Sequence, residues 1–163
     1  MAQPQTALAI SKARTGAARA DPGKRWAGVL EGIPLFAGVP RRQVRKIAAL
    51  TREARYRTGT AIVRAGERGD DFFLILDGSA SVHRPSGLPS IRLGPGAYFG
   101  EMALIDGEVR SATVVAETDV QCLRLSRAPF LRMLRKEPEV AIVMLRQLAA
   151  RVRELQARAE LTA

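Results

Sequence analysis

The stretch FGEMALIDGEVRSATV contains a carboxylate, Glu101, and an arginine, Arg110, nine positions apart. Gly100 precedes the carboxylate, while Ser111 and Ala112 follow the arginine, so small residues lie next to both charges. An arginine can donate two charge-assisted hydrogen bonds to the oxygens of one phosphate. A carboxylate only accepts hydrogen bonds, so beside a phosphate it would bind hydroxyl groups such as those of a ribose. The pattern predicts a pocket for one phosphate attached to one sugar.

The chain around these charges can supply further hydrogen-bond donors. If Phe99 ends a strand, residues 101–104 can form one helical turn that includes Met102 and Ala103. The first N–H groups of a helix have no partner within the helix and attract phosphate. Gly100 lets the backbone approach a ligand closely because it has no side chain. A simpler alternative stays open, in which the two charged side chains form a salt bridge that fixes a loop.

The composition is that of one folded domain with a basic N-terminal region. The chain has 163 residues, 47% of them hydrophobic, and a formal net charge of +10. Residues 1–60 carry 12 Lys/Arg against 3 acidic residues, whereas residues 61–163 carry 14 against 13. Residues 1–25 are rich in Ala and Gly and predict a basic, flexible tail, whose binding to polyanions would follow from charge alone. The folded domain is expected over residues 26–161.

The single cysteine, Cys122, excludes an internal disulfide and a cysteine-based zinc site, and its apolar surroundings predict a small buried thiol. No apolar stretch approaches the ~20 residues of a membrane-spanning helix. The N-terminus lacks the apolar block of a secretory signal. These features predict a protein of the cytoplasm.

Three regions follow one another along the chain. Residues 26–57 show apolar residues at helical spacing, and residues 59–126 contain short apolar runs separated by Gly/Pro/Asp turns. Such runs predict an antiparallel barrel or double-sheet roll. Residues 127–161 are helical again, with Pro138 at the start of the last helix. Six residues of this helix recur at alternating spacings of four and three and predict a coiled-coil seam, or a helix packed on its own domain: Ala141, Leu145, Leu148, Val152, Leu155 and Ala159.

The residues GAYFGEMALIDGEVRSATVVAETD resemble the phosphate-binding cassette of cyclic nucleotide-binding domains. These domains are found in protein kinase A regulatory subunits, the bacterial catabolite activator protein and cyclic nucleotide-gated channels. The resemblance continues in IPLFAGVPRRQVRKIA and GTAIVRAGERGDDFFLILDGSASV upstream and in LRLSRAPFLRML downstream, and it covers roughly residues 29–155. It implies an α+β fold, in which an antiparallel, jelly-roll-like β-roll is flanked by N-terminal helices, a short cassette helix and C-terminal B and C helices.

Residue by residue, the resemblance assigns Glu101 to the ribose 2′-hydroxyl and Arg110 to the cyclic phosphate. Ser111 stands where many cGMP-selective members have threonine, which favours cAMP as ligand, with cGMP also bound. The last helix caps the base in this family, and the candidates for the cap are Leu145, Arg146 and Leu148. The remaining site residues complete the phosphate cradle or flank the base: Phe99, Gly100, Met102, Ala103, Ala112, Val82 and Ile91.

The resemblance implies a cyclic nucleotide receptor whose last helix moves over the bound base and signals to an effector protein. Met1 favours a stand-alone receptor over a fragment of a longer chain, and the helical seam could also join two copies in a homodimer. An enzyme is not expected, because no nucleophile–base pair or His/Asp cluster is present, and no cofactor or metal is expected besides the ligand. The alternative is a DNA-associated regulator of the catabolite activator type without its own helix-turn-helix, whose basic N-terminal arm contacts DNA. Only charge supports this alternative, so nucleic acid is not expected as a partner.

Overall fold

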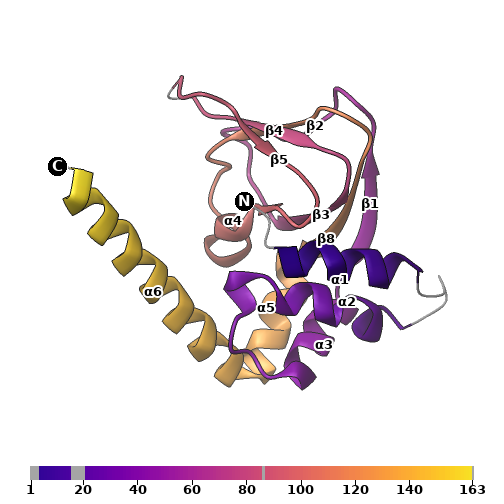
Figure 1. Cartoon of the computed structure of the whole chain (residues 1–163). Helices are drawn as coiled ribbons and strands as arrows, with labels where there is room; N and C mark the ends of the chain where they lie inside the picture. The colour runs from indigo at the N-terminus through magenta and orange to yellow at the C-terminus, as the bar shows by residue number, and fades with distance from the viewer. Residues whose placement is uncertain (1–3, 16–20, 86, 163) are drawn as a thin grey trace.

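The computed structural model describes residues 4–15, 21–85 and 87–162. In these residues helices come first, a β-roll follows, and helices close the chain (Figure 1). The first helical elements are α1 (Pro4–Thr15), α2 (Pro22–Glu31), the 3₁₀ helix η1 (Pro34–Phe36) and α3 (Arg41–Ala49). The strands are β1 (Arg52–Tyr56), β2 (Ala61–Val63), β3 (Asp71–Asp77), β4 (Ala80–His83), β5 (Ile91–Leu93), β6 (Tyr98–Phe99), β7 (Thr113–Ala116) and β8 (Val120–Ser126).

The β-roll consists of two antiparallel sheets, and the chain passes back and forth between them. In the described residues one sheet has the strand order β1–β8–β3–β6 and the other has the order β2–β7–β4–β5. The short helix α4 (Glu101–Asp106) lies between β6 of the first sheet and β7 of the second. The last helices are α5 (Arg127–Lys136) and α6 (Pro138–Thr162). The expected α+β fold, with a roll, a short helix directly after Phe99 and two C-terminal helices, is confirmed.

Two apolar clusters fix the helices and the two sheets to one another. The larger cluster joins the helices to the first sheet, and in it the Phe36 ring meets the rings of Phe72 and Phe130 edge to face, with centroids 6.2 and 6.4 Å away. The smaller cluster fills the roll and includes Phe73 and Cys122. Burial raises the pKa of the Cys122 thiol to about 12. The thiol is therefore the small buried group that the sequence predicted.

The structure corrects the expectation that the helical pattern of residues 26–57 continues to its end. Residues 52–56 form the strand β1, which pairs with β8 at the other end of the domain. Helix α3 stops just before this strand, where Thr51 donates hydrogen bonds from its backbone N–H and its hydroxyl to the Ala48 carbonyl. A strand whose partner lies far along the chain is favoured by tertiary pairing, which local helical spacing does not reveal.

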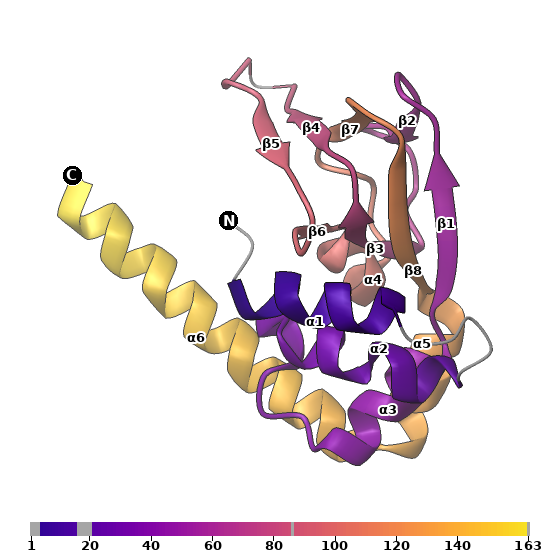
Figure 2. The ribbon, with the colours of Figure 1, turned by 45° about the vertical axis from the view of Figure 1, so that its right-hand side comes forward.

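The structure also differs from the expectation that residues 1–25 form a flexible tail. Residues 4–15 form helix α1, which lies along α2 (Figure 2). Ile10 is only 3% exposed, and the Thr6 hydroxyl donates a hydrogen bond to the Gly32 carbonyl. An Ala-rich helix can dock through a few buried side chains because small residues allow close approach, so its composition resembles that of a solvated tail. Residues 1–3 and 16–20 lie outside the described part of the chain.

Two further contacts fix this N-terminal region. Arg14 of α1 pairs with Asp77 of β3, and the Asp21 carboxylate accepts a hydrogen bond from the Gly23 N–H and so caps α2. The described part of the basic arm is therefore a packed helix. The alternative of a free arm that contacts DNA is not favoured.

Helix α6 begins against the body of the domain and then projects past the roll (Figures 1 and 2). Val140 and Met144 in its first turns are buried. Between Arg151 and Glu160, every side chain that the structure describes is exposed. In the described residues, no helix combines the length and the apolar character needed to cross a bilayer.

Candidate functional site

A cavity of about 340 Å³, here called the roll cavity, opens between α4, the β4–β5 strands and the start of β7. The fold brings residues of six separate segments together in its wall. The wall contains every residue that the sequence singled out for the phosphate, the ribose and the flanks of the base, although not the three candidates for the cap: Val82, Ile91, Phe99, Gly100, Glu101, Met102, Ala103, Arg110, Ser111 and Ala112. The cavity thus unites predicted residues that lie as far apart in the sequence as Val82 and Ala112.

Arg110 is a buried cation in the wall of the roll cavity, with 8% of its surface exposed. Its Cζ lies 5.9 Å from the centroid of the Phe73 ring. A Cβ atom added to Gly69 would overlap the Arg110 Nε, and one added to Gly100 would lie 2.6 Å from the Arg110 Nη1. The two glycines therefore leave the space that the guanidinium occupies.

The backbone of Arg110 is hydrogen-bonded to the turn before β3, which fixes the position of the residue. Its N–H donates to the Glu67 carbonyl at 2.8 Å, and its carbonyl accepts from the Gly66 N–H at 2.9 Å. In contrast, its Nη1 atom is buried and has no hydrogen-bond partner among the described residues. A buried donor without a partner costs about 1–3 kcal/mol.

Neighbouring carboxylates only partly offset the effect of burial on the pKa of the Arg110 guanidinium. Burial lowers the pKa of the Arg110 guanidinium, while Asp71 and Asp70 act in the opposite direction. The Asp71 carboxylate is already engaged, because it accepts from the Ser126 hydroxyl at 2.6 Å and pairs with Arg124 at 3.0 Å. Arginine remains protonated at neutral pH, so the cavity keeps a positive charge that can receive an anion.

Glu101 is the first residue of α4 and supplies the carboxylate of the roll cavity. Within the described chain no ion pair joins it to Arg110, so the simple salt bridge between these two residues is not what the structure contains. Its Oε1 atom instead lies 3.7 Å from the Nη1 atom of Arg151 in α6. The two charges of the sequence motif therefore face the cavity separately, one as a cation and one as an acceptor.

The rest of the roll cavity is largely apolar. Ile91 and Met102 are 43% and 63% exposed, and Val109 in the same wall is 57% exposed. Large apolar side chains that remain exposed beside a charged end suit a ligand with an anionic group and an apolar part. The first turn of α4 adds the N–H groups that a helix leaves without intrahelical partners.

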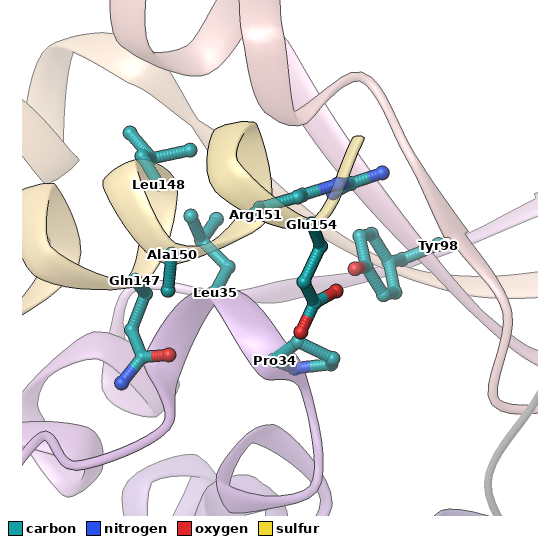
Figure 3. Close-up of a pocket in the computed structure, with 8 residues that line it drawn as sticks. All are labelled: Pro34, Leu35, Tyr98, Gln147, Leu148, Ala150, Arg151 and Glu154. Carbon is teal, nitrogen blue, oxygen red and sulfur yellow. The ribbon is translucent and has the colours of Figure 1, made fainter. Parts of the chain in front are cut away.

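Sequence reasoning missed several residues of this wall, and Arg151 is the most consequential. Arg151 reaches the roll cavity from α6, and it also lines a cavity of about 220 Å³ between α6 and η1. In Figure 3 its side chain extends from α6 toward Tyr98. Leu145 and Arg146 are exposed and line neither of these two cavities, whereas Leu148, one turn before Arg151, lines the smaller one. The other residues that were missed are Val63, Arg84, Leu93, Tyr98, Val109 and Val114.

One signal in the sequence could have identified Arg151. Val140, Met144, Leu148 and Arg151 are spaced by four, four and three residues, so they share the face of α6 that turns toward the domain. In the described residues, no group of three or more His, Cys, Asp or Glu side chains is arranged to hold a metal ion.

Comparisons with known proteins give one consistent family. The family model of the cyclic nucleotide-binding domain matches residues 53–137. A cyclic nucleotide-gated potassium channel of Mesorhizobium japonicum is 41% identical over 123 residues, which are 76% of this chain and 34% of the channel. The chain spans about a third of the length of the curated channel relatives it matches.

Solved structures with the same fold come from different kinds of protein. The N-terminal domain of a transcriptional regulator from Streptomyces coelicolor A3(2) matches with a TM-score of 0.68 at 30% identity, over 77% of this chain and 90% of that domain. The regulatory domain of Toxoplasma gondii PKA, crystallised with cAMP, matches with a TM-score of 0.64 at 28% identity, over 79% of this chain and 50% of that one.

Proposed function

Because the chain belongs to the cyclic nucleotide-binding domain family, we propose that it is a receptor for cAMP that regulates a protein partner. The observation that carries this proposal is the Arg110 guanidinium, which is buried in the wall of the roll cavity and has a nitrogen without a hydrogen-bond partner among the described residues. In the proposal the cyclic phosphate accepts hydrogen bonds from this guanidinium and from the N–H groups at the start of α4.

The other residues of the roll cavity fit the rest of such a nucleotide. Glu101 would accept a hydrogen bond from the ribose 2′-hydroxyl, and Ser111 and Ala112 would leave room beside the phosphate. Val82 and Ile91 would flank the base from β4 and β5. We propose cAMP as the preferred ligand because Ser111 lacks the methyl group of the threonine found in many cGMP-selective members, and we expect cGMP to bind more weakly.

Helix α6 is the element that we propose to respond to the ligand. Its far half is exposed, yet Arg151 in this half already contacts Glu101 in the roll cavity. A ligand that binds better when α6 lies over the base would shift the helix toward that position. Coupling of this kind is typically worth about 1–3 kcal/mol.

The partner would recognise the outer face of α6. Ile142, Leu145 and Val152 on this face are 49%, 64% and 53% exposed. We propose that this face binds an effector protein or joins two copies of the chain in a homodimer, and that the protein acts in the cytoplasm. The side chain of Leu155, which belongs to the expected seam, lies outside the described part of the chain. No reaction is assigned to the chain.

Calorimetric titration of the wild-type chain tests the proposal. We expect cAMP to bind with a one-to-one stoichiometry, cGMP to bind more weakly, and 5′-AMP, which lacks the cyclic phosphate, to bind more weakly still. Equal affinity for cAMP and 5′-AMP would contradict a site built for a cyclic phosphate. Absence of binding by all three nucleotides would reject the proposed function.

A further inference from the structure

Helix α4 has a glycine at each end, and each glycine lies against an arginine side chain. Gly100 precedes the helix and faces Arg110, while Gly107 follows it and faces Arg127. Gly107 has a φ of +72°, and a Cβ atom added there would lie 2.9 Å from the Cζ of Arg127. The Arg127 guanidinium therefore occupies the space that a side chain at position 107 would need.

Arg127 connects three parts of the structure. It is the first residue of α5, and its Nη2 donates to the Ile105 carbonyl in the last turn of α4 at 3.3 Å. Its backbone N–H donates to the Asp70 carbonyl, just before β3, at 2.7 Å. Its Nε atom is buried without a hydrogen-bond partner among the described residues. The side chain is thus partly buried between α4 and α5.

The charge of Arg127 stabilises α4, whose C-terminal end it meets, and not α5, the helix to which it belongs. A positive charge is stabilising at the C-terminal end of a helix, where Arg127 meets α4, and destabilising at an N-terminal end, where it stands in α5. The first turn of α5 contains no acidic residue that would offset the charge. Arg127 is therefore placed for its contact with α4.

The two arginines at the ends of α4 also meet the same short segment before β3. The Asp70 carbonyl accepts from Arg127, and the carboxylates of Asp70 and Asp71 act on the charge of Arg110. Helix α5 then leads through Glu137 directly into α6. A continuous set of contacts runs from the phosphate side of the roll cavity through α4 and Arg127 to the last two helices.

We propose that Arg127 is a positioning residue that makes α5 follow α4, so that a displacement of α4 by the ligand reaches α6. This inference rests on the proposed function, because it supposes that a nucleotide in the roll cavity displaces α4. Arg127 does not line the roll cavity, so it acts on the ligand only through α4.

Hydrogen exchange of the α6 amides, measured on the full chain with and without saturating cAMP, tests the inference. We expect Arg127→Ala to bind cAMP and to lose most of the ligand-dependent change in exchange over residues 138–160. Arg127→Lys keeps the charge but not the planar fork and should give an intermediate response. The control is Arg132→Ala, an exposed arginine of the same helix, which should respond like the wild type.

A wild-type response of α6 in Arg127→Ala would overturn the inference. If Arg127→Ala did not fold, Gly107→Ala would test the same contact from the other side, because its Cβ would displace the guanidinium from the Ile105 carbonyl. A full α6 response in Gly107→Ala would overturn the inference equally.

Failure of the proposed function would have a different signature, namely no cAMP binding by the wild type. The inference would then be tested in the ligand-free protein, where loss of the Arg127 contact should change the exchange of α6 amides far from the substitution. Identical α6 exchange in wild type and Arg127→Ala would overturn it there as well.

Discussion

Glu101 and Arg151 face each other between α4 and α6, with 3.7 Å between the carboxylate Oε1 and the guanidinium Nη1. The Glu101 side chain is 21% exposed and the Arg151 side chain is 54% exposed. In the proposed complex the same carboxylate receives the ribose hydroxyl, so the ligand and α6 meet at one acceptor. This relationship places the last helix in contact with the site.

The ion pair should contribute little to stability, because one of its partners is largely solvated. Arg151→Ala is expected to change the free energy of unfolding by less than about 1 kcal/mol, measured by urea denaturation. Arg153→Ala is the matched control, since Arg153 is exposed on the same helix and lines none of the cavities described. A loss of several kcal/mol in Arg151→Ala alone would show that the pair is a structural one.

Glu101→Gln should weaken cAMP binding by roughly 10- to 150-fold, because a hydrogen bond to a charged group is worth about 1.5–3 kcal/mol. In calorimetry, wild type should distinguish cAMP from 2′-deoxy-cAMP, while Glu101→Gln should bind the two with similar affinity. Glu108→Gln, at an exposed loop position outside the cavity, serves as the control. If Glu101→Gln still discriminated fully between the two ligands, the ribose would not be bound by this carboxylate.

Gly100→Ala should abolish nucleotide binding and destabilise the fold. Gly100 has a φ of +82°, and an added Cβ would lie 2.6 Å from both the Arg110 Nη1 and the Asp71 carbonyl. Backbone strain of this kind costs about 1–3 kcal/mol before any clash is counted. Thermal unfolding and cAMP titration of the variant measure the two effects separately.

Gly59→Ala is the matched control for this substitution. Gly59 has a φ of +83°, but no atom lies within 4 Å of an added Cβ. It should therefore show the strain alone, with a lower melting temperature and unchanged cAMP affinity. Equal effects of the two substitutions on binding would mean that the clash with Arg110 is irrelevant to the site.

Stability at acid pH should depend on the contact between Glu137 and Lys46, which joins the α5–α6 junction to α3. The hydrogen bond from the Lys46 ammonium lowers the pKa of the Glu137 carboxyl from its ordinary value of 4.5. A depressed pKa contributes stability above the unfolded value, and this contribution is lost as the pH falls through the folded value. Urea denaturation should show a smaller stability loss below about pH 4.5 for Glu137→Gln than for wild type. Equal pH dependence of the two proteins would contradict this contribution.

The sequence allowed the cassette side of the site to be predicted because its residues are local. Glu101, Arg110 and Ser111 stand within one short stretch, and the turn residues around them determine how their side chains are oriented toward the cavity. The β-roll was also predictable, since short apolar runs between turns have few other solutions. The position of α6 was not, because a helix can rotate by one residue without changing its apolar pattern. Arg151 therefore escaped attention while Leu145 and Arg146 were expected.

Features that depend on contacts between distant parts of the chain also could not be predicted from the sequence. Residues 52–56 read as the end of a helix, and only pairing with β8 makes them a strand. Helix α1 read as a tail because its Ala-rich composition gives little apolar contrast, although Ile10 is buried. In each case tertiary contacts decide between local alternatives of similar free energy.

The most direct test of the whole account is calorimetric titration of cAMP into wild type, Arg110→Ala and Arg110→Lys, with Arg57→Ala as an exposed control outside the roll cavity. Removing a buried partner of the phosphate should cost about 2–5 kcal/mol, so Arg110→Ala should bind at least roughly 30-fold more weakly. The cAMP affinity of Arg110→Lys should lie between those of the wild type and Arg110→Ala, and the affinity of Arg57→Ala should equal that of the wild type. Wild-type affinity in Arg110→Ala would contradict the assignment of this cavity to a cyclic phosphate.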